Sequence, residues 1–144
     1  MPRATILIVE DNVAQSQALA EALQFAGFTT LQARLGIQAL QIATENRPDL
    51  ILMDTQLPDL DGLAAAETLK SDPVMARIPI VVMTAHDLEG EQARTMTRTC
   101  VGYVQKPVQP RHLVTLITAI LKLPSEGVTP AKKTHAKPPA DRRR

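Results

Sequence analysis

The sequence predicts a single α/β domain, built on an open parallel sheet of five strands with helices packed on both faces. Short apolar runs, clearest at residues 6–9, 50–53 and 78–83, alternate with longer segments of helical periodicity. Continuous runs of Val, Ile and Leu indicate strands that are buried on both faces, as in a parallel sheet. At 144 residues the chain is long enough for one domain with a substantial core. Such alternation is typical of a doubly wound fold.

Five βα units follow one another along the chain. The strands are expected near residues 5–9, 28–33, 50–54, 79–84 and 101–105, and the helices near 12–26, 36–46, 62–70, 88–99 and 109–122. Asn12 suits the N-cap of the first helix, and Gly27 suits its end. The last helix has the clearest pattern, because Pro110 suits a first turn and apolar residues then recur at three- and four-residue steps.

The charged residues are distributed unevenly. Residues 1–123 contain 10 basic and 13 acidic residues, whereas residues 124–144 contain 6 basic and 2 acidic residues. The second segment also has four prolines and almost no apolar residues. We therefore expect a folded domain over 1–123 and a basic, proline-rich, disordered tail over 124–144. Without interleaved aromatic residues, the tail is expected to bind nucleic acid only weakly and in a salt-dependent way.

The composition favours a cytoplasmic protein. The single cysteine, Cys100, has no partner for an intramolecular disulfide, and it is expected to be a small buried side chain. No apolar run approaches the roughly 18 residues that a membrane span needs, and the N-terminal apolar stretch is too short for a signal peptide. The three histidines, His86, His112 and His135, do not have the spacing of metal ligands.

Polar residues follow the predicted strands at the points where these strands end. Glu10 and Asp11 follow the first, Asp54 and Thr84 end the third and fourth, and Lys106 follows the fifth. Ligands of open α/β sheets bind at this edge, so we expect one shared crevice. Three carboxylates there raise one another's pKa unless a cation lies among them, and oxygen ligands suit Mg2+. Asp54 would then accept a phosphoryl group, with the metal and Lys106 neutralising its charge and Thr84 donating a hydrogen bond.

Each residue also has a plainer interpretation. Asp54 alone would suit a turn cap, the acidic pair would complement a helix dipole, and Thr84 and Tyr103 would serve as ordinary packing residues. The occurrence of Asp11, Thr84 and Lys106 in register with Asp54 favours a phosphoacceptor over a cap.

The segments ILIVEDN, PDLILMDTQLPDLDG, IPIVVMTA and YVQKP resemble the receiver domain of bacterial two-component response regulators, the CheY-like fold. The resemblance covers about residues 4–122, and its separated motifs occur in the right order at compatible spacing. The stretch TLQARLGIQALQIATENRPDLILMDTQLP is particularly similar to single-domain regulators of the DivK type. The resemblance implies a doubly wound (βα)5 fold of flavodoxin-like strand order 2-1-3-4-5.

The resemblance also implies a metal and phosphorylation site. Asp54 corresponds to the phosphoacceptor, Asp11 to the carboxylate that binds Mg2+, and Glu10 to its acidic neighbour that acts through water. Asp54 itself would also contact the metal. Gln56 occupies the position whose backbone carbonyl is a metal ligand in the family.

Three further positions correspond to the family's switch and phosphate-binding residues. Thr84 matches the switch hydroxyl, Tyr103 the switch aromatic residue, and Lys106 the lysine that pairs with the phosphoryl group. The bond between Lys106 and Pro107 is cis in the family, which suits a tight turn.

Four positions raise questions of their own. Gly62 matches a turn glycine for which a positive φ is expected. Thr99 stands where receivers commonly have glycine, so a left-handed backbone there would be strained and the end of the fourth helix rearranged. Gln56 and His86 are polar but not acidic, at positions whose side chains tune autodephosphorylation in the family.

The function implied is that of a single-domain response regulator in a phosphorelay. A histidine kinase or histidine phosphotransfer protein would phosphorylate Asp54 with Mg2+ as cofactor, and the product would bind a downstream protein, since no effector domain follows. A weak homodimer on phosphorylation is left open, and membrane or nucleic-acid partners are not expected. The alternative is a phosphorylation-independent docking module.

Two enzyme or cofactor functions are disfavoured. Haloacid-dehalogenase-like phosphatases also use a strand-end aspartate but need a second one two residues on, where this chain has Gln56. We therefore expect self-phosphorylation and autodephosphorylation only, with no turnover of outside substrates. A dinucleotide site is not supported, since no G-x-G-x-x-G follows the first strand.

Overall fold

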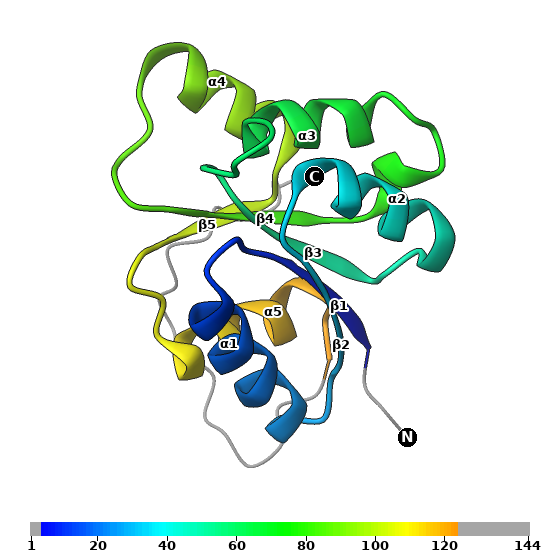
Figure 1. The fold of residues 1–144 in the computed structure, drawn as a ribbon, viewed down its shortest axis with the longest axis vertical. Coiled ribbons are helices and arrows are strands. Elements are labelled where there is room, and N and C mark those ends of the chain that lie inside the picture. Colours follow the sequence, from blue (N-terminus) through cyan, green and yellow to red (C-terminus); the bar gives the residue numbers. More distant parts are fainter. Residues whose placement is uncertain (1–3, 124–144) are drawn as a thin grey trace.

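The computed structural model describes residues 4–123, so the predicted tail over 124–144 lies outside the described residues. A parallel five-stranded sheet runs through the centre of this part of the chain (Figure 1). Its strands are β1 (Thr5–Val9), β2 (Thr29–Ala33), β3 (Leu50–Asp54), β4 (Ile80–Thr84) and β5 (Gly102–Gln105), in the order β2-β1-β3-β4-β5. The predicted fold class and strand order are confirmed.

Helices cover both faces of the sheet (Figure 1). They are α1 (Val13–Phe25), α2 (Gly36–Asn46), α3 (Gly62–Lys70), α4 (Gly90–Thr99) and α5 (Pro110–Ile120), with a short 3-10 helix η1 (Met75–Arg77) that the sequence pattern did not predict. α1 and α5 lie on one face, and α2, α3 and α4 lie on the other. Within residues 4–123, no helix has the length and apolar character needed to cross a membrane.

The side chains of each central strand alternate between two apolar cores. Ile6 and Ile8 of β1 pack in the core beneath α1 and α5, whereas Leu7 and Val9 pack in the core beneath α2 and α3. All four are fully buried. Because both faces of the sheet are covered, the central strands β1, β3 and β4 consist largely of apolar runs, as the sequence indicated.

The ends of the helices follow local capping rules. Asn12 caps α1, its Oδ1 accepting a hydrogen bond of 2.9 Å from the backbone N–H of Gln15. Gly27 follows this helix with a φ of 100°, a conformation that glycine adopts without strain. Pro110 begins α5, where its missing N–H costs nothing. These three predictions are confirmed.

The expectation of a positive φ at Gly62 is wrong. In the described part of the chain, the glycines with positive φ are Gly27 and Gly90. Gly62 is required for space instead: a Cβ at this position would overlap the carbonyl oxygen of Asp54 and lie 2.9 Å from Cα of Thr55. The start of α3 is therefore packed directly against the end of β3.

The expectation of strain at Thr99 is also wrong. Among described residues other than glycine, positive φ occurs at Arg47 and Lys122, and Thr99 is the last residue of an ordinary α4. Its side chain is buried, and its Oγ1 donates to the carbonyl of Thr95 at 2.8 Å. Cys100, which follows, is only partly buried. The helix thus ends without the left-handed residue that would favour glycine.

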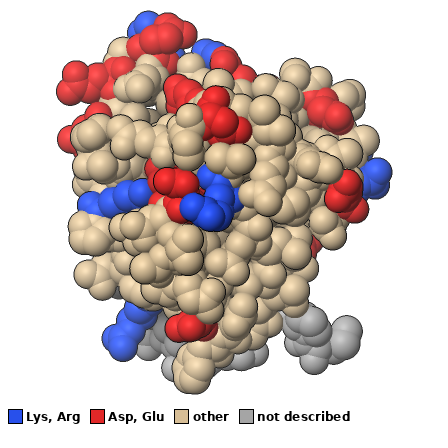
Figure 2. All heavy atoms as spheres, viewed as in Figure 1, with Lys and Arg blue, Asp and Glu red and all other residues tan. Residues whose placement is uncertain are grey.

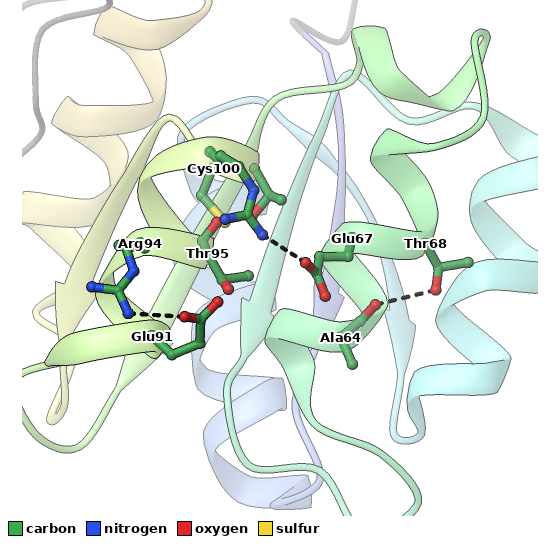
Figure 3. A network of polar contacts seen from close by, with 9 residues as sticks. Ala64, Glu67, Thr68, Glu91, Arg94, Thr95 and Cys100 are labelled. Atoms are coloured by element: carbon green, nitrogen blue, oxygen red, sulfur yellow. Dashed lines mark hydrogen bonds and ion pairs between the residues drawn. The ribbon is translucent and has the colours of Figure 1, made fainter.

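Polar side chains join α3 to α4 (Figure 3). Arg98 of α4 donates to a carboxylate oxygen of Glu67 on α3 at 2.8 Å, and both side chains are about half exposed. Within α4, Arg94 pairs with Glu91 at 2.9 Å. Exposed ion pairs of this kind contribute little stability, so they hold α4 in place less strongly than full burial holds the central strands.

Candidate functional site

The carboxyl ends of the strands bring the predicted site residues to one edge of the sheet. β3 ends in Asp54 and β4 ends in Thr84, whereas Glu10 and Lys106 directly follow β1 and β5. The backbone register places Asp54 beside Met83 on the neighbouring strand. Because the strands are parallel neighbours, residues that are distant in the sequence meet here.

Lys106 lies between two buried carboxylates. Its Nζ is 2.7 Å from Oδ2 of Asp54 and 3.1 Å from Oε1 of Glu10. The carboxylates are almost inaccessible, with 2% of Glu10 and 4% of Asp54 exposed, while 23% of the lysine side chain is exposed. Acidic and basic side chains also lie against each other on the face drawn in Figure 2. Three of the predicted site residues are therefore in direct contact.

Burial and charge set the ionisation of this group. Burial is the largest influence on Glu10; together with the charge of Asp54 it raises the Glu10 pKa, outweighing the N–H of Asn12 and the ammonium of Lys106. Burial disfavours the charged form of Lys106, but the hydrogen bond to Asp54 and the charges of Asp54 and Glu10 outweigh it and raise the lysine pKa. The lysine is thus held as the cation that the carboxylates need.

One oxygen of Glu10 retains acceptor capacity. Oε2 accepts a hydrogen bond of 3.0 Å from the backbone N–H of Asn12. Oε1 is buried and has no hydrogen-bond partner of good geometry, although it lies within ion-pair distance of Lys106. An unsatisfied buried acceptor next to Asp54 suits a water molecule that is bound to a metal ion.

Asp11 stands apart from the other two carboxylates. Its side chain is 49% exposed and lies 4.0 Å from Arg34, which follows β2. Accordingly, within residues 4–123 no three His, Cys, Asp or Glu side chains form a metal-holding group. The oxygen donors fit Mg2+ in kind, but the predicted convergence of three carboxylates is only partly present. The sequence pattern did not predict the approach of Arg34, because this contact joins two distant segments of the chain that no local pattern relates.

The loop between β3 and α3 folds back on itself and carries Gln56. The N–H of Gln56 donates to Oδ1 of Asp54 at 2.9 Å, and Gln56 forms an antiparallel bridge with Asp61. The N–H of Gly62 donates to the carbonyl of Thr55 at 3.0 Å. These contacts hold the two ends of the loop beside the predicted phosphoacceptor.

The two predicted switch residues have different surroundings. Thr84 is buried, and its Oγ1 donates to the carbonyl of His86 at 2.7 Å. Tyr103 on β5 is partly buried and lines a pocket with other residues of this region, namely Asp87, Leu88 and Met96. The Lys106–Pro107 bond is cis, as the resemblance implied.

The comparisons with known proteins agree with this geometry. Residues 6–118 match the response regulator receiver domain family, and the chain belongs to this family. The polar-differentiation response regulator DivK of Brucella anthropi is 38% identical over 117 residues, which cover 81% of this chain and 94% of that protein. DivK of Brucella abortus is 36% identical over 113 residues, which cover 78% and 92% of the two chains.

Solved structures show the same relationship. The receiver domain of a sensor histidine kinase from Pseudomonas aeruginosa, with a magnesium ion coordinated in its active-site cleft, is 30% identical with a TM-score of 0.75 and covers 83% of this chain and 98% of that one. The signal receiver domain of a histidine kinase from Syntrophus aciditrophicus is 28% identical with a TM-score of 0.76, covering 88% and 98%. The chain is thus a receiver domain of two-component signalling, similar over most of its length to DivK.

Proposed function

We propose that Asp54 accepts a phosphoryl group from a histidine kinase or a histidine phosphotransfer protein, and that the phosphorylated receiver signals by contact with a downstream protein. The observation that carries this proposal is the contact of 2.7 Å between Lys106 Nζ and Asp54 Oδ2, beside the second buried carboxylate of Glu10. An ammonium group in this position can pair with phosphoryl oxygens and neutralise their charge.

The metal would be held by oxygen atoms of four residues. Asp11, Asp54 and the backbone carbonyl of Gln56 would bind Mg2+ directly, and Glu10 would bind it through water. Bound Mg2+ supplies positive charge that stabilises the phosphoryl oxygens during transfer. Asp11 would have to leave Arg34, which an exposed contact of 4.0 Å permits at little cost.

The residues around the acceptor then have separate tasks. A carboxylate oxygen of Asp54 attacks phosphorus while the bond from phosphorus to the donor histidine nitrogen breaks. Lys106 exchanges its contact with Asp54 for one with a phosphoryl oxygen. The Thr84 hydroxyl, now on the His86 carbonyl, turns to donate to another phosphoryl oxygen. Tyr103 of β5, which lines a pocket with Met96 of α4, would convey the change to α4.

Phosphorylation with a small donor tests this proposal. Incubation with acetyl phosphate and Mg2+ should add the mass of one phosphoryl group to the wild type, and neither chelator-treated protein nor Asp54→Asn should gain it. Asp49→Asn changes an exposed carboxylate that follows α2, before β3 begins, and should behave as the wild type. If the folded wild type gains no adduct, the phosphorylation-independent docking module becomes the better explanation. An adduct on Asp54→Asn would contradict the assigned acceptor.

A further inference from the structure

Asp59 joins the loop between β3 and α3 to the start of α2. Its Oδ1 accepts the backbone N–H of Gly36 at 2.8 Å, and its Oδ2 accepts that of Ile37 at 3.0 Å. The residue at the N-cap of α2, Leu35, makes no side-chain cap of its own. Asp59 therefore caps the helix from 22 or more positions away in the sequence. The two N–H groups, that of Ile37 first, lower the Asp59 pKa.

The next residue of the loop makes a second contact with the same turn of α2. A Cβ at Gly36 would lie 2.7 Å from Cγ of Leu60, so the absence of a side chain at 36 lets Leu60 pack directly on the backbone of the helix. Leu60 also packs against the core beneath α2 and α3. We call these four residues, Gly36, Ile37, Asp59 and Leu60, the α2 latch.

The latch contacts a loop that contains one of the predicted site residues. Residues 55–61 carry Gln56 and begin directly after Asp54, and their other contacts described above join the two ends of the loop to Asp54, to each other and to the start of α3. The latch instead ties the middle of this segment to α2, the helix that precedes β3 in the chain. If it opened, the loop could shift relative to β3 and the Gln56 carbonyl would move with it.

We propose that Asp59 is a positioning residue: by fastening loop 55–61 to α2, it holds the backbone carbonyl of Gln56 where Mg2+ needs it, without touching the ion. This inference rests on the proposed function, because it assigns Asp59 a role in the metal site named there. Groups that orient metal ligands from outside the coordination sphere typically change metal affinity by about 10- to 100-fold.

Removal of the latch carboxylate tests the role directly. For Asp59→Ala, Mg2+ titration followed by backbone amide NMR shifts, without any phosphodonor, should show affinity weakened by about tenfold. Amide hydrogen exchange should accelerate in residues 55–61 and at the start of α2, while exchange in β1 and β3 changes little. Asp59→Asn, which keeps one acceptor oxygen, should give an intermediate affinity. With acetyl phosphate, the Mg2+ concentration for half-maximal phosphorylation should rise in Asp59→Ala, with the maximal rate kept within about twofold.

Asp72→Ala is a matched control. Oδ1 of Asp72 likewise accepts two backbone N–H groups at the start of a helical turn, those of Val74 at 2.9 Å and Met75 at 3.3 Å. It lies in the connection from α3 to β4, away from the carboxyl ends of the strands. This variant should lose stability but keep the Mg2+ affinity of the wild type, which separates positioning from a general loss of stability.

The outcomes are distinct. Equal Mg2+ affinity in Asp59→Ala and a wild type that binds Mg2+ and is phosphorylated would overturn the positioning role and leave the proposed function intact. A wild type that neither binds Mg2+ nor is phosphorylated would overturn both. If Asp59→Ala does not fold, Leu60→Ala weakens the other half of the latch and is expected to show the same loss of affinity; unchanged affinity there would again overturn the role.

Discussion

At the scale of single residues, Lys106 allows two carboxylates, those of Glu10 and Asp54, to be buried at one edge of the sheet. A buried carboxylate costs free energy unless it is paired, and Glu10 and Asp54 are both nearly inaccessible. The lysine pairs with both carboxylates at once. Because its side chain is partly exposed, its ammonium group can move outward to contact a phosphoryl oxygen on Asp54. The same side chain therefore stabilises the resting site and suits the proposed transfer.

Replacement of Gly62 by alanine is expected to destabilise the fold strongly. The new Cβ would overlap the Asp54 carbonyl oxygen, a backbone atom that cannot move without shifting β3. We expect urea denaturation to show a loss of at least about 2 kcal/mol in unfolding free energy. Gly90→Ala is the control, because its surroundings are open and its φ of 59° costs only about 1 kcal/mol. A Gly62→Ala loss no larger than that of Gly90→Ala would refute the close approach.

We expect the thiol of Cys100 to become reactive at a higher pH in the native protein than in the unfolded protein. Burial raises the pKa of its thiol, outweighing the hydrogen bond with Thr99 and the nearby charge of Lys70. Only the thiolate reacts with iodoacetamide, and a raised pKa leaves less thiolate at any pH below it. Alkylation of native protein should therefore be slower than that of urea-unfolded protein at pH 8, and the native rate should rise at higher pH. Equal native and unfolded rates across this range would contradict the shift.

At the scale of elements, the sequence pattern predicted every strand and every α-helix of the described residues. β3 was predicted at its observed bounds, because every residue from Leu50 to Asp54 is buried. α2 and α3 were also predicted at their observed bounds, whereas α1, α4 and α5 differ at one or both ends by one or two residues, partly because caps such as Asn12 were counted as helix. The 3-10 helix η1 and the position of Asp11 beside Arg34 were missed, because both depend on contacts between distant segments that no local pattern marks.

The end of α4 provides a test of an incorrect expectation. If Thr99 were strained, Thr99→Gly would stabilise the protein; the structure instead predicts a loss of about 2 kcal/mol, from a buried side chain, a hydrogen bond and helix propensity. Thr44→Gly is the control, because the exposed Thr44 makes the same type of bond to a carbonyl four residues earlier in α2. It should lose only about 0.5 kcal/mol. Chemical denaturation of both variants would decide, and a stabilised Thr99→Gly would restore the strain interpretation.

At the scale of the whole molecule, the site lies where the two cores meet the edge of the sheet. Asp54 follows Leu52 and Met53, which face opposite cores, and Glu10 follows Ile8 and Val9 in the same way. The positions of Asp54 and Glu10 thus depend on the packing of both cores. The sequence predicted which residues meet, because the alternation of elements indicated an open parallel sheet and the family resemblance implied its strand order. Side-chain directions, as at Asp11 and Thr84, depend on the assembled edge and could not be predicted in this way.

Because the proposed metal site is formed by the folded sheet and is lost on unfolding, Mg2+ should stabilise the entire domain. Binding to the native state alone adds RT ln(1 + [Mg2+]/Kd), about 1.4 kcal/mol at ten times Kd. Urea denaturation with Mg2+ and with chelator should show this difference in wild type at an unchanged m-value, since the surface exposed on unfolding is the same. Asp11→Asn removes a proposed ligand and should lose most of the increment, whereas Asp49→Asn, altered in the connection from α2 to β3, should retain it. An equal increment in Asp11→Asn and wild type would place the stabilising ion elsewhere on the molecule, and no increment in wild type would contradict metal binding at this edge.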